Sequence, residues 1–191
     1  MMSPWQLKRV CHAIERGAVI AYPTDTIWGF GCHPMNHAAI QRLLSIKQRP
    51  TKKGLILLAA HHDYCRTFVD ESKFQQFCDQ VSQPTPRPRT WIVAASSQCP
   101  PWLKGKTPNI AIRITDKPLI KRLSDSLQSP LVSTSANVAG RRDARNRLLI
   151  NRHFGTQVDF ILEDAEQHSQ LNARGIASEI IELQSGKILR A

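Results

Sequence analysis

The chain has 191 residues, enough to bury the core of one domain, and we expect a single domain over residues 1–191. Its 26 basic and 15 acidic residues give a formal net charge of +11, which indicates a polyanionic ligand: a nucleotide, RNA or both. The five cysteines are odd in number and include no Cys-x-x-Cys pair, so we expect reduced thiols in a cytoplasmic protein. No apolar run approaches the roughly 20 residues that span a bilayer, so we expect no membrane partner.

Apolar periodicity predicts helices that alternate with strands along the chain. Ser3 and Asn36 have the type and position of helix N-caps, and the two helices end at Gly17 and at Lys47. Further helical patterns lie near 62–69, near 71–81 and after Pro118. The predicted strands cover residues 18–22, 55–60, 91–95, 110–114, 130–133, 158–162 and 179–183, and a hairpin-like turn follows at 184–187. The continuous apolar run 55–60 is typical of a strand buried on both faces of a parallel or mixed sheet, so an α/β fold is expected.

Polar segments beside these strands form the candidate site. The expected loops are Tyr22–Gly31, Lys47–Gly54, 83–90, 96–108 and Ser133–Asn137. Three of these loops, Tyr22–Gly31, Lys47–Gly54 and Ser133–Asn137, are polar and flank predicted strands. Loops at strand ends are where α/β proteins bind ligands, and the basic loop among the three suits phosphate.

The cationic turn has two interpretations. A helix C-terminus favours cations, so the turn fits a solvated charge run at a helix end. It also fits a phosphate site, because Lys47 offers a point charge and Arg49 a planar fork of donors, with Lys53 near enough in sequence to join them and Lys52 left in solvent. We expect Lys47→Ala to leave the fold intact, because a surface cation contributes little to stability.

The other polar candidates also leave alternatives open. Arg113 is the one charge in the strand 110–114 and must pair with a carboxylate of the protein or with an anionic ligand. The Ser133–Asn137 segment suits either ligand contacts or turn and cap chemistry. Asp25 suits a cap, a magnesium ligand or a receiver for a ligand amine.

Several familiar site patterns are absent. The chain has neither Gly-x-x-x-x-Gly-Lys-Ser/Thr nor Gly-x-Gly-x-x-Gly, so any nucleotide site is of another design, and no Gly-x-Ser-x-Gly supports a serine hydrolase. His33 and His37 have i,i+4 spacing, but Pro34 lies between them and no third ligand is near in sequence, so we expect no metal site. The pair His61 and His62 is interpreted as a helix start.

Five segments together resemble the YrdC/Sua5 family, the threonylcarbamoyl-AMP synthases. They are Tyr22–Gly31, Lys47–Pro50, Lys53–Ile56, Ala111–Pro118 and Pro130–Asn137. The resemblance implies a twisted open mixed sheet with flanking helices around a basic cavity. It implies a reaction of ATP with L-threonine and bicarbonate or carbon dioxide, with Mg²⁺ accompanying ATP, that gives L-threonylcarbamoyl-adenylate and diphosphate. The product would serve a downstream tRNA threonylcarbamoyltransferase.

The resemblance also implies roles for individual residues. Thr24 and Arg113 would bind L-threonine, with Arg113 at its carboxylate. Lys47 and Arg49 would clamp the phosphates as the catalytic cations. The remaining ATP contacts would be Lys53, Thr90, Ser133, Ser135, Asn137 and Arg190.

One segment departs from the family pattern. Residues Thr85–Thr90 stand where the family has Trp-Pro-Gly-Pro-x-Thr, and Arg87 replaces its glycine. If that glycine has a backbone shape open only to glycine, Arg87 reshapes the loop. The alternative function is a tRNA- or double-stranded-RNA-binding module without synthase activity, which would use the same basic cavity together with the basic segment from Arg141 to Arg152.

Overall fold

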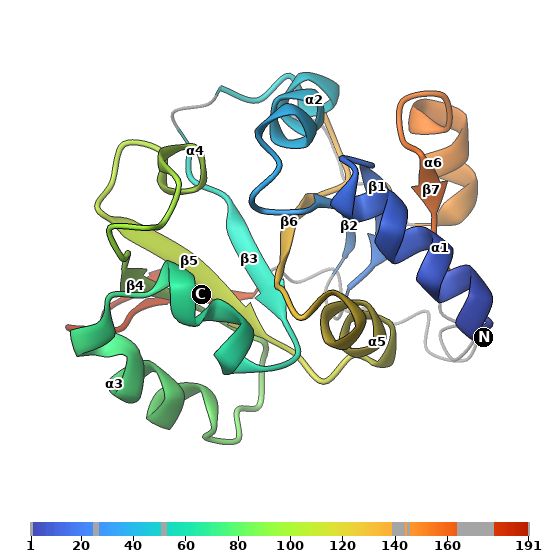
Figure 1. Ribbon diagram of the computed structural model, residues 1–191. Helices are drawn as coiled ribbons and strands as arrows, with labels where there is room; N and C mark the ends of the chain where they lie inside the picture. Colours follow the sequence, from blue (N-terminus) through green and yellow to red (C-terminus); the bar gives the residue numbers. More distant parts are fainter. Residues whose placement is uncertain are drawn as a thin grey trace.

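A nine-stranded mixed sheet forms the centre of the computed structural model, and helices lie on both of its faces (Figure 1). The structure describes residues 2–24, 27–50, 53–138, 144, 146–163 and 178–190. The strand order is β7-β1-β2-β6-β3-β5-β4-β8-β9, so strands from both halves of the chain alternate in the sheet. Parallel pairs (β1 with β7, β3 with β5, β4 with β8) stand among antiparallel ones, which confirms the prediction of a mixed α/β sheet.

The elements agree with most of the predicted ones. The strands are β1 (Ile20–Pro23), β2 (Trp28–Cys32), β3 (Ile56–Ala59), β4 (Arg89–Ala94), β5 (Asn109–Ile114), β6 (Leu131–Ser135), β7 (Phe160–Ile161), β8 (Glu179–Glu182) and β9 (Ile188–Arg190). The helices are α1 (Pro4–Glu15), α2 (His37–Lys47), the 3-10 helix η1 (His62–Phe68), α3 (Glu71–Val81), α4 (Pro101–Lys104), α5 (Pro118–Leu127) and α6 (Arg147–Phe154). Among these described helices, none has the length and apolar character that a bilayer crossing requires.

Strand β2 was missed by the sequence prediction, which places Tyr22–Gly31 in a loop. β2 pairs antiparallel with β1, so most of this segment belongs to the two strands of a hairpin, whose connection lies between Pro23 and Trp28. Two glycines weaken the strand pattern of β2, yet the sheet requires one of them: a Cβ on Gly31 would lie 2.5 Å from the Val132 carbonyl oxygen and 2.7 Å from Tyr22 Cε1. Glycine at this position therefore marks a close approach of strands and not a turn.

Three further boundaries differ from the prediction. β6 continues through Ser135, because Ser133 and Ser135 pair with Gly31 and Gly29 of β2. The short helix α4 lies in the predicted loop 96–108, where Pro101 occupies its first position. Helix α6 lies in the basic segment for which no element was predicted, and Asn146 caps it.

Apolar side chains form one core on each face of the sheet. Leu57, Ile112 and Val132 point to the face that carries the larger core, where α2, η1, α3 and α6 also contribute. Leu58 and Leu131 point to the opposite face, where they pack with residues of α1 and α5. Helices α1 and α5 lie against each other on that face (Figure 1).

Replacing Asn36 with alanine is expected to lower the free energy of unfolding by about 1 kcal/mol. The Asn36 side chain accepts a hydrogen bond from the Ala39 amide at 3.0 Å and caps α2, the helix that ends at Lys47. Urea denaturation would measure the loss, and Asn36→Asp is the matched control because it retains the acceptor. A loss of the same size in Asn36→Asp would assign the effect to the amide group, which lies beside Gly17.

Candidate functional site

Strand register places several predicted site residues on one face of the sheet, which we call the site face. Ser133 pairs with Gly31 on one side and with Ile56 on the other, Ile56 pairs with Ala111, and Ala111 pairs with Ile92. Paired residues point to the same face, and every second residue along a strand returns to it. The site face therefore carries Ser133, Ser135, Arg113 and Thr90.

The site face changes from apolar to polar along its strands. Leu131 of β6 belongs to the core under α1 and α5, whereas Ser133 and Ser135 follow it on the same face. Likewise Leu58 lies in that core while its partner in register, Arg113, is 5% exposed and charged. The polar side chains thus adjoin the helix-covered core, and the sheet gathers them although they are far apart in sequence.

Thr24 lies at the end of β1 beside Ser133. Its hydroxyl donates to the Ile27 carbonyl oxygen at 2.7 Å, which holds the side chain in the hairpin connection. A Cβ on Gly29 would lie 3.4 Å from Thr24 Cγ2 and 3.5 Å from Ser133 Oγ, so the two side chains flank this glycine. Asp25, the other polar candidate of this segment, lies outside the described residues.

Lys47 is buried, which overturns both the interpretation of the turn as a solvated charge run and the expectation of a surface cation. The side chain is 1% exposed at the last residue of α2. Its Nζ donates to the Ser135 carbonyl oxygen, to the Asn137 carbonyl oxygen at 3.0 Å and to Asn137 Oδ1 at 2.8 Å. Ser135 Oγ donates to the same Asn137 Oδ1 at 2.7 Å. Three predicted site residues therefore form one hydrogen-bonded group, which we call the lysine cluster.

Arg49 lies two residues beyond Lys47 and is half-buried. Its Nη2 donates to the Gly54 carbonyl oxygen at 2.7 Å, while its buried Nε has no hydrogen-bond partner in the described part of the chain. Desolvation lowers the pKa of the guanidinium. A buried N–H without an acceptor is costly, so this donor is suited to an anionic oxygen from a ligand.

A second group joins Thr90, Ser178 and Arg190. The Thr90 and Ser178 hydroxyls lie 2.8 Å apart, and Arg190 Nη2 donates to the Ser178 carbonyl oxygen at 2.8 Å. Thr90 pairs with Ile180 and Ile180 with Arg190, so the group extends along one row of the sheet. Burial and the charge of Arg113 both lower the pKa of Arg190. Two guanidinium groups close together favour an anion near them.

Other predicted residues lie differently from the expectation. Thr90 is the second residue of β4 and not part of the Pro-rich loop, which the strand shortens to 83–88. Lys53 is exposed and its described contacts are made by its backbone, with Pro50 and Gly105. Ser178 was missed, and the only sequence signal for it is a hydroxyl immediately before a predicted strand.

The four histidines singled out in the sequence form two pairs in the structure. His37 stacks on Trp102 with ring centroids 4.5 Å apart, and His33 Nδ1 accepts from the Met35 amide, so this pair has packing and loop contacts. His61 and His62 begin η1, as predicted. They also lie beside Asp63, which the sequence analysis did not consider as a ligand.

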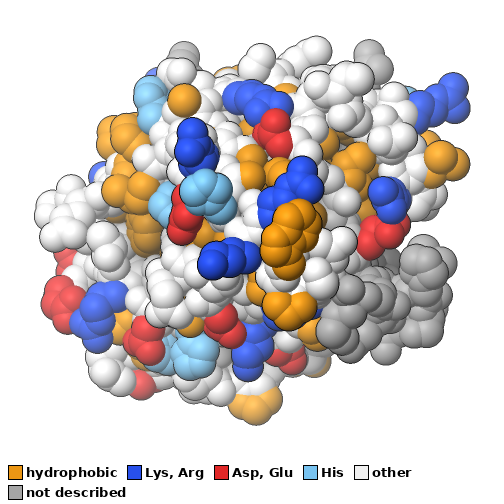
Figure 2. All heavy atoms as spheres, turned by 45° about the vertical axis from the view of Figure 1, so that its right-hand side comes forward, with side chains coloured by type: hydrophobic (Ala, Val, Ile, Leu, Met, Phe, Trp, Pro, Cys, Tyr) orange, Lys and Arg blue, Asp and Glu red, His pale blue; other side chains and the backbone are white. Residues whose placement is uncertain are grey.

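Among the described residues on the side of α1 and α6, no continuous basic stripe is present (Figure 2). Figure 2 shows Lys and Arg side chains there singly, among acidic and hydrophobic ones. Arg147 pairs with Glu163 at 2.9 Å. Arg141, Arg142 and Arg145 lie outside the described residues.

Fold and site together define an α/β domain whose mixed sheet presents hydroxyl and cationic side chains on one face, and Ser135 of that face also belongs to the lysine cluster. The chain belongs to the Sua5/YciO/YrdC family, whose description is "Telomere recombination" and which matches residues 12–191. A threonylcarbamoyl-AMP synthase from Stutzerimonas stutzeri (strain A1501) is 40% identical over 190 residues, covering 100% of this chain and 99% of that protein. The family resemblance of the sequence is thereby confirmed.

Solved structures show the same fold. P. abyssi Sua5 complexed with L-threonine matches with a TM-score of 0.80 at 20% identity, over 97% of this chain and 53% of that longer one. This chain thus spans about half of that protein. E. coli YciO matches with a TM-score of 0.76 at 22% identity, over 98% of this chain and 89% of YciO. At these identities the likeness concerns the fold alone.

Proposed function

We propose that this protein is an L-threonylcarbamoyl-AMP synthase, which joins L-threonine, bicarbonate or carbon dioxide, and ATP, and releases diphosphate. One observation carries the proposal: residues from distant parts of the sequence share one sheet face (Thr90, Arg113, Ser133 and Ser135), and Lys47 and Asn137 are hydrogen-bonded to each other and to Ser135 at the end of β6. Full-length relatives at about 40% identity that are named threonylcarbamoyl-AMP synthase support it. A module that only binds RNA would not need these hydroxyl and amide groups.

The reaction forms a C–N bond and a P–O bond, and it breaks an N–H bond and the bond from the α-phosphorus to the bridging oxygen; if bicarbonate is the carbon source, water is also released. The amine of L-threonine adds to carbon dioxide and loses a proton, which gives a carbamate. A carbamate oxygen then attacks the α-phosphorus of ATP, the bond from that phosphorus to the bridging oxygen breaks, and diphosphate leaves with the electron pair. Positioning and neutralisation of charge are therefore the main tasks of the protein.

The described residues suit these tasks. Lys47 and Arg49 would neutralise the phosphates, with Arg49 Nε as a donor that still lacks an acceptor. Arg113 would bind the carboxylate of L-threonine by a charge-assisted hydrogen bond, and Thr24 would lie beside the amino acid. Thr90, Ser133, Ser135, Asn137 and Arg190 would contact ATP, and Lys53 would join the phosphate side.

Mg²⁺ would enter with ATP as counter-ion of the phosphates. The oxygen atoms of Ser135 and Asn137 lie against Lys47 Nζ, so a second cation at those atoms would be repelled. The lysine cluster therefore does not fit a Mg²⁺ ligand set. We assign the ion to phosphate oxygens and water, which Mg²⁺ commonly retains in nucleotide sites.

The decisive experiment measures diphosphate release from ATP by the purified protein. We expect release that requires both L-threonine and bicarbonate, with L-threonylcarbamoyl-AMP identified by mass spectrometry. Release that is unchanged without L-threonine would refute the proposal. We further propose that the product serves a tRNA threonylcarbamoyltransferase in the cytoplasm.

A further inference from the structure

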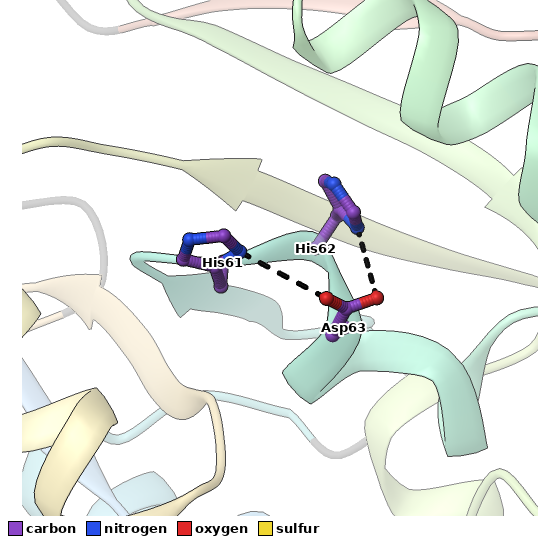
Figure 3. A group of neighbouring side chains, drawn as sticks. All are labelled: His61, His62 and Asp63. Carbon is purple, nitrogen blue, oxygen red and sulfur yellow. Dashed lines mark ion pairs between the residues drawn. The ribbon is translucent and has the colours of Figure 1, made fainter.

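Three side chains with metal-binding atoms lie together where β3 leads into η1 (Figure 3). His61 Nδ1 lies 3.9 Å from Asp63 Oδ2, and His62 Nδ1 lies 3.2 Å from Asp63 Oδ1. Each of the three residues offers one ligand atom, and these three atoms all lie within 4.8 Å of one another. The carboxylate lies between the two rings, and each of its oxygens is paired with the Nδ1 of one imidazole (Figure 3).

A thiol from a different element adjoins this group. Cys78 of α3 places its Sγ 3.4 Å from His62 Nδ1. The other four cysteines of the chain are buried, and Cys78 alone is partly exposed. His62, Asp63 and Cys78 line a groove of about 560 Å³ between η1 and α3. Solvent and ions thus have access to the imidazole, carboxylate and thiol groups from one side.

We propose that His61, His62 and Asp63 bind a divalent transition-metal ion of the zinc type, with Cys78 as the fourth ligand. Two nitrogen or oxygen ligands about 2.0–2.2 Å from a tetrahedral zinc ion are about 3.4 Å apart, and a sulfur at about 2.3 Å lies roughly 3.6 Å from a nitrogen ligand. The distances of His62 Nδ1 to Asp63 Oδ1 and to Cys78 Sγ, 3.2 and 3.4 Å, are close to these separations. Imidazole, thiolate and carboxylate are also the ligand types that zinc prefers in proteins.

The surroundings do not oppose a cation. Arg66 also lines the groove, but its guanidinium pairs with Glu71 at 2.7 Å and lies over the Phe74 ring at 4.0 Å. His61 is the N-cap residue of η1 without a side-chain cap bond, so its ring is not required for capping. A bound ion would connect the start of η1 with α3, whose Phe74 and Phe77 pack in the larger core, on the sheet face opposite the site face. None of the residues that line the groove belongs to the site face or to the lysine cluster, so the metal site is separate from the proposed catalytic site.

The test uses untagged full-length protein that has been treated with a chelator and then titrated calorimetrically with Zn²⁺. We expect one ion per chain. His62→Gln and Asp63→Asn should each weaken Zn²⁺ binding by at least about tenfold. Loss of a residue that only supports a metal ligand already costs about tenfold in affinity, so loss of a ligand itself should cost no less. His12→Gln is the matched control, because His12 lies 3.9 Å from Glu15 in a helix and belongs to no group of three ligands among the described residues. Circular dichroism would verify the fold of each variant. If His62→Gln or Asp63→Asn misfolds, His61→Gln, at an exposed position, would replace it in the test.

Substitution of Co²⁺ for Zn²⁺ tests Cys78 without any mutation. A cobalt–thiolate bond gives a charge-transfer absorption in the near ultraviolet, which we expect in the wild-type protein and expect to be lost in Cys78→Ala. The absence of that absorption from the wild type would overturn the assignment of Cys78. An absence of Zn²⁺ binding, or binding that His61→Gln, His62→Gln and Asp63→Asn leave unchanged, would overturn the site.

Discussion

Replacing Lys47 with methionine is expected to reduce L-threonine-dependent diphosphate release by about 10²–10³-fold, as for other single donors that stabilise developing charge. The methionine side chain keeps much of the buried volume but lacks the ammonium group. Initial rates at saturating ATP and L-threonine would measure the loss. A rate within threefold of wild type would remove Lys47 from the catalytic machinery.

The same substitution should also lower the free energy of unfolding by about 1–3 kcal/mol, because partly buried oxygen atoms of Ser135 and Asn137 lose a donor. This expectation replaces the one drawn from the sequence, which treated Lys47 as a surface cation. Denaturant titration would separate lost stability from lost chemistry, since rates can be expressed per folded molecule. Lys8→Met, at an exposed lysine of α1, is the matched control for both measurements.

Arg113→Met is expected to raise the KM for L-threonine by at least about tenfold, because a hydrogen bond to a charged group contributes about 1.5–3 kcal/mol. The KM for ATP should change much less. Arg113→Lys keeps the charge but not the planar fork, so an intermediate KM is expected. Arg16→Met, at an exposed position after α1, is the matched control. A variant in which KM rises for ATP and not for L-threonine would move Arg113 to the phosphate side.

Much of the fold could be predicted because its signals are local. The Ser3 cap of α1 and the Asn36 cap of α2 follow from residue types at single positions. The apolar runs that became β3 and β5 also carry their signal within a few residues. Strand β2 was missed because the close approach that requires Gly31 involves Tyr22 and Val132, and Val132 is far away in sequence.

The site was predictable in part for the same reason. Lys47, Ser135 and Asn137 were selected as candidates, but a charge run at a helix end does not reveal that one of its cations is buried. Ser178 has no pattern of its own, and its contacts to Thr90 and Arg190 depend on how β4, β8 and β9 assemble. The carboxylate of Asp63 beside His61 and His62 was readable from the sequence, whereas the thiol of Cys78 becomes visible only once α3 packs against η1.

The lysine cluster also implies that ATP binding is an exchange of acceptors. An ammonium group has three N–H donors, and three oxygen atoms of Ser135 and Asn137 already receive hydrogen bonds from Lys47. A phosphate oxygen that approaches Nζ must replace or share one of them, and Asn137 Oδ1 is the one that a side-chain rotation can release. The free protein therefore holds its main cation in place with an internal substitute for the ligand. If Lys47 binds ATP as proposed, affinity for ATP reflects the difference between two acceptors, and the lysine is already in place when the α-phosphorus is attacked.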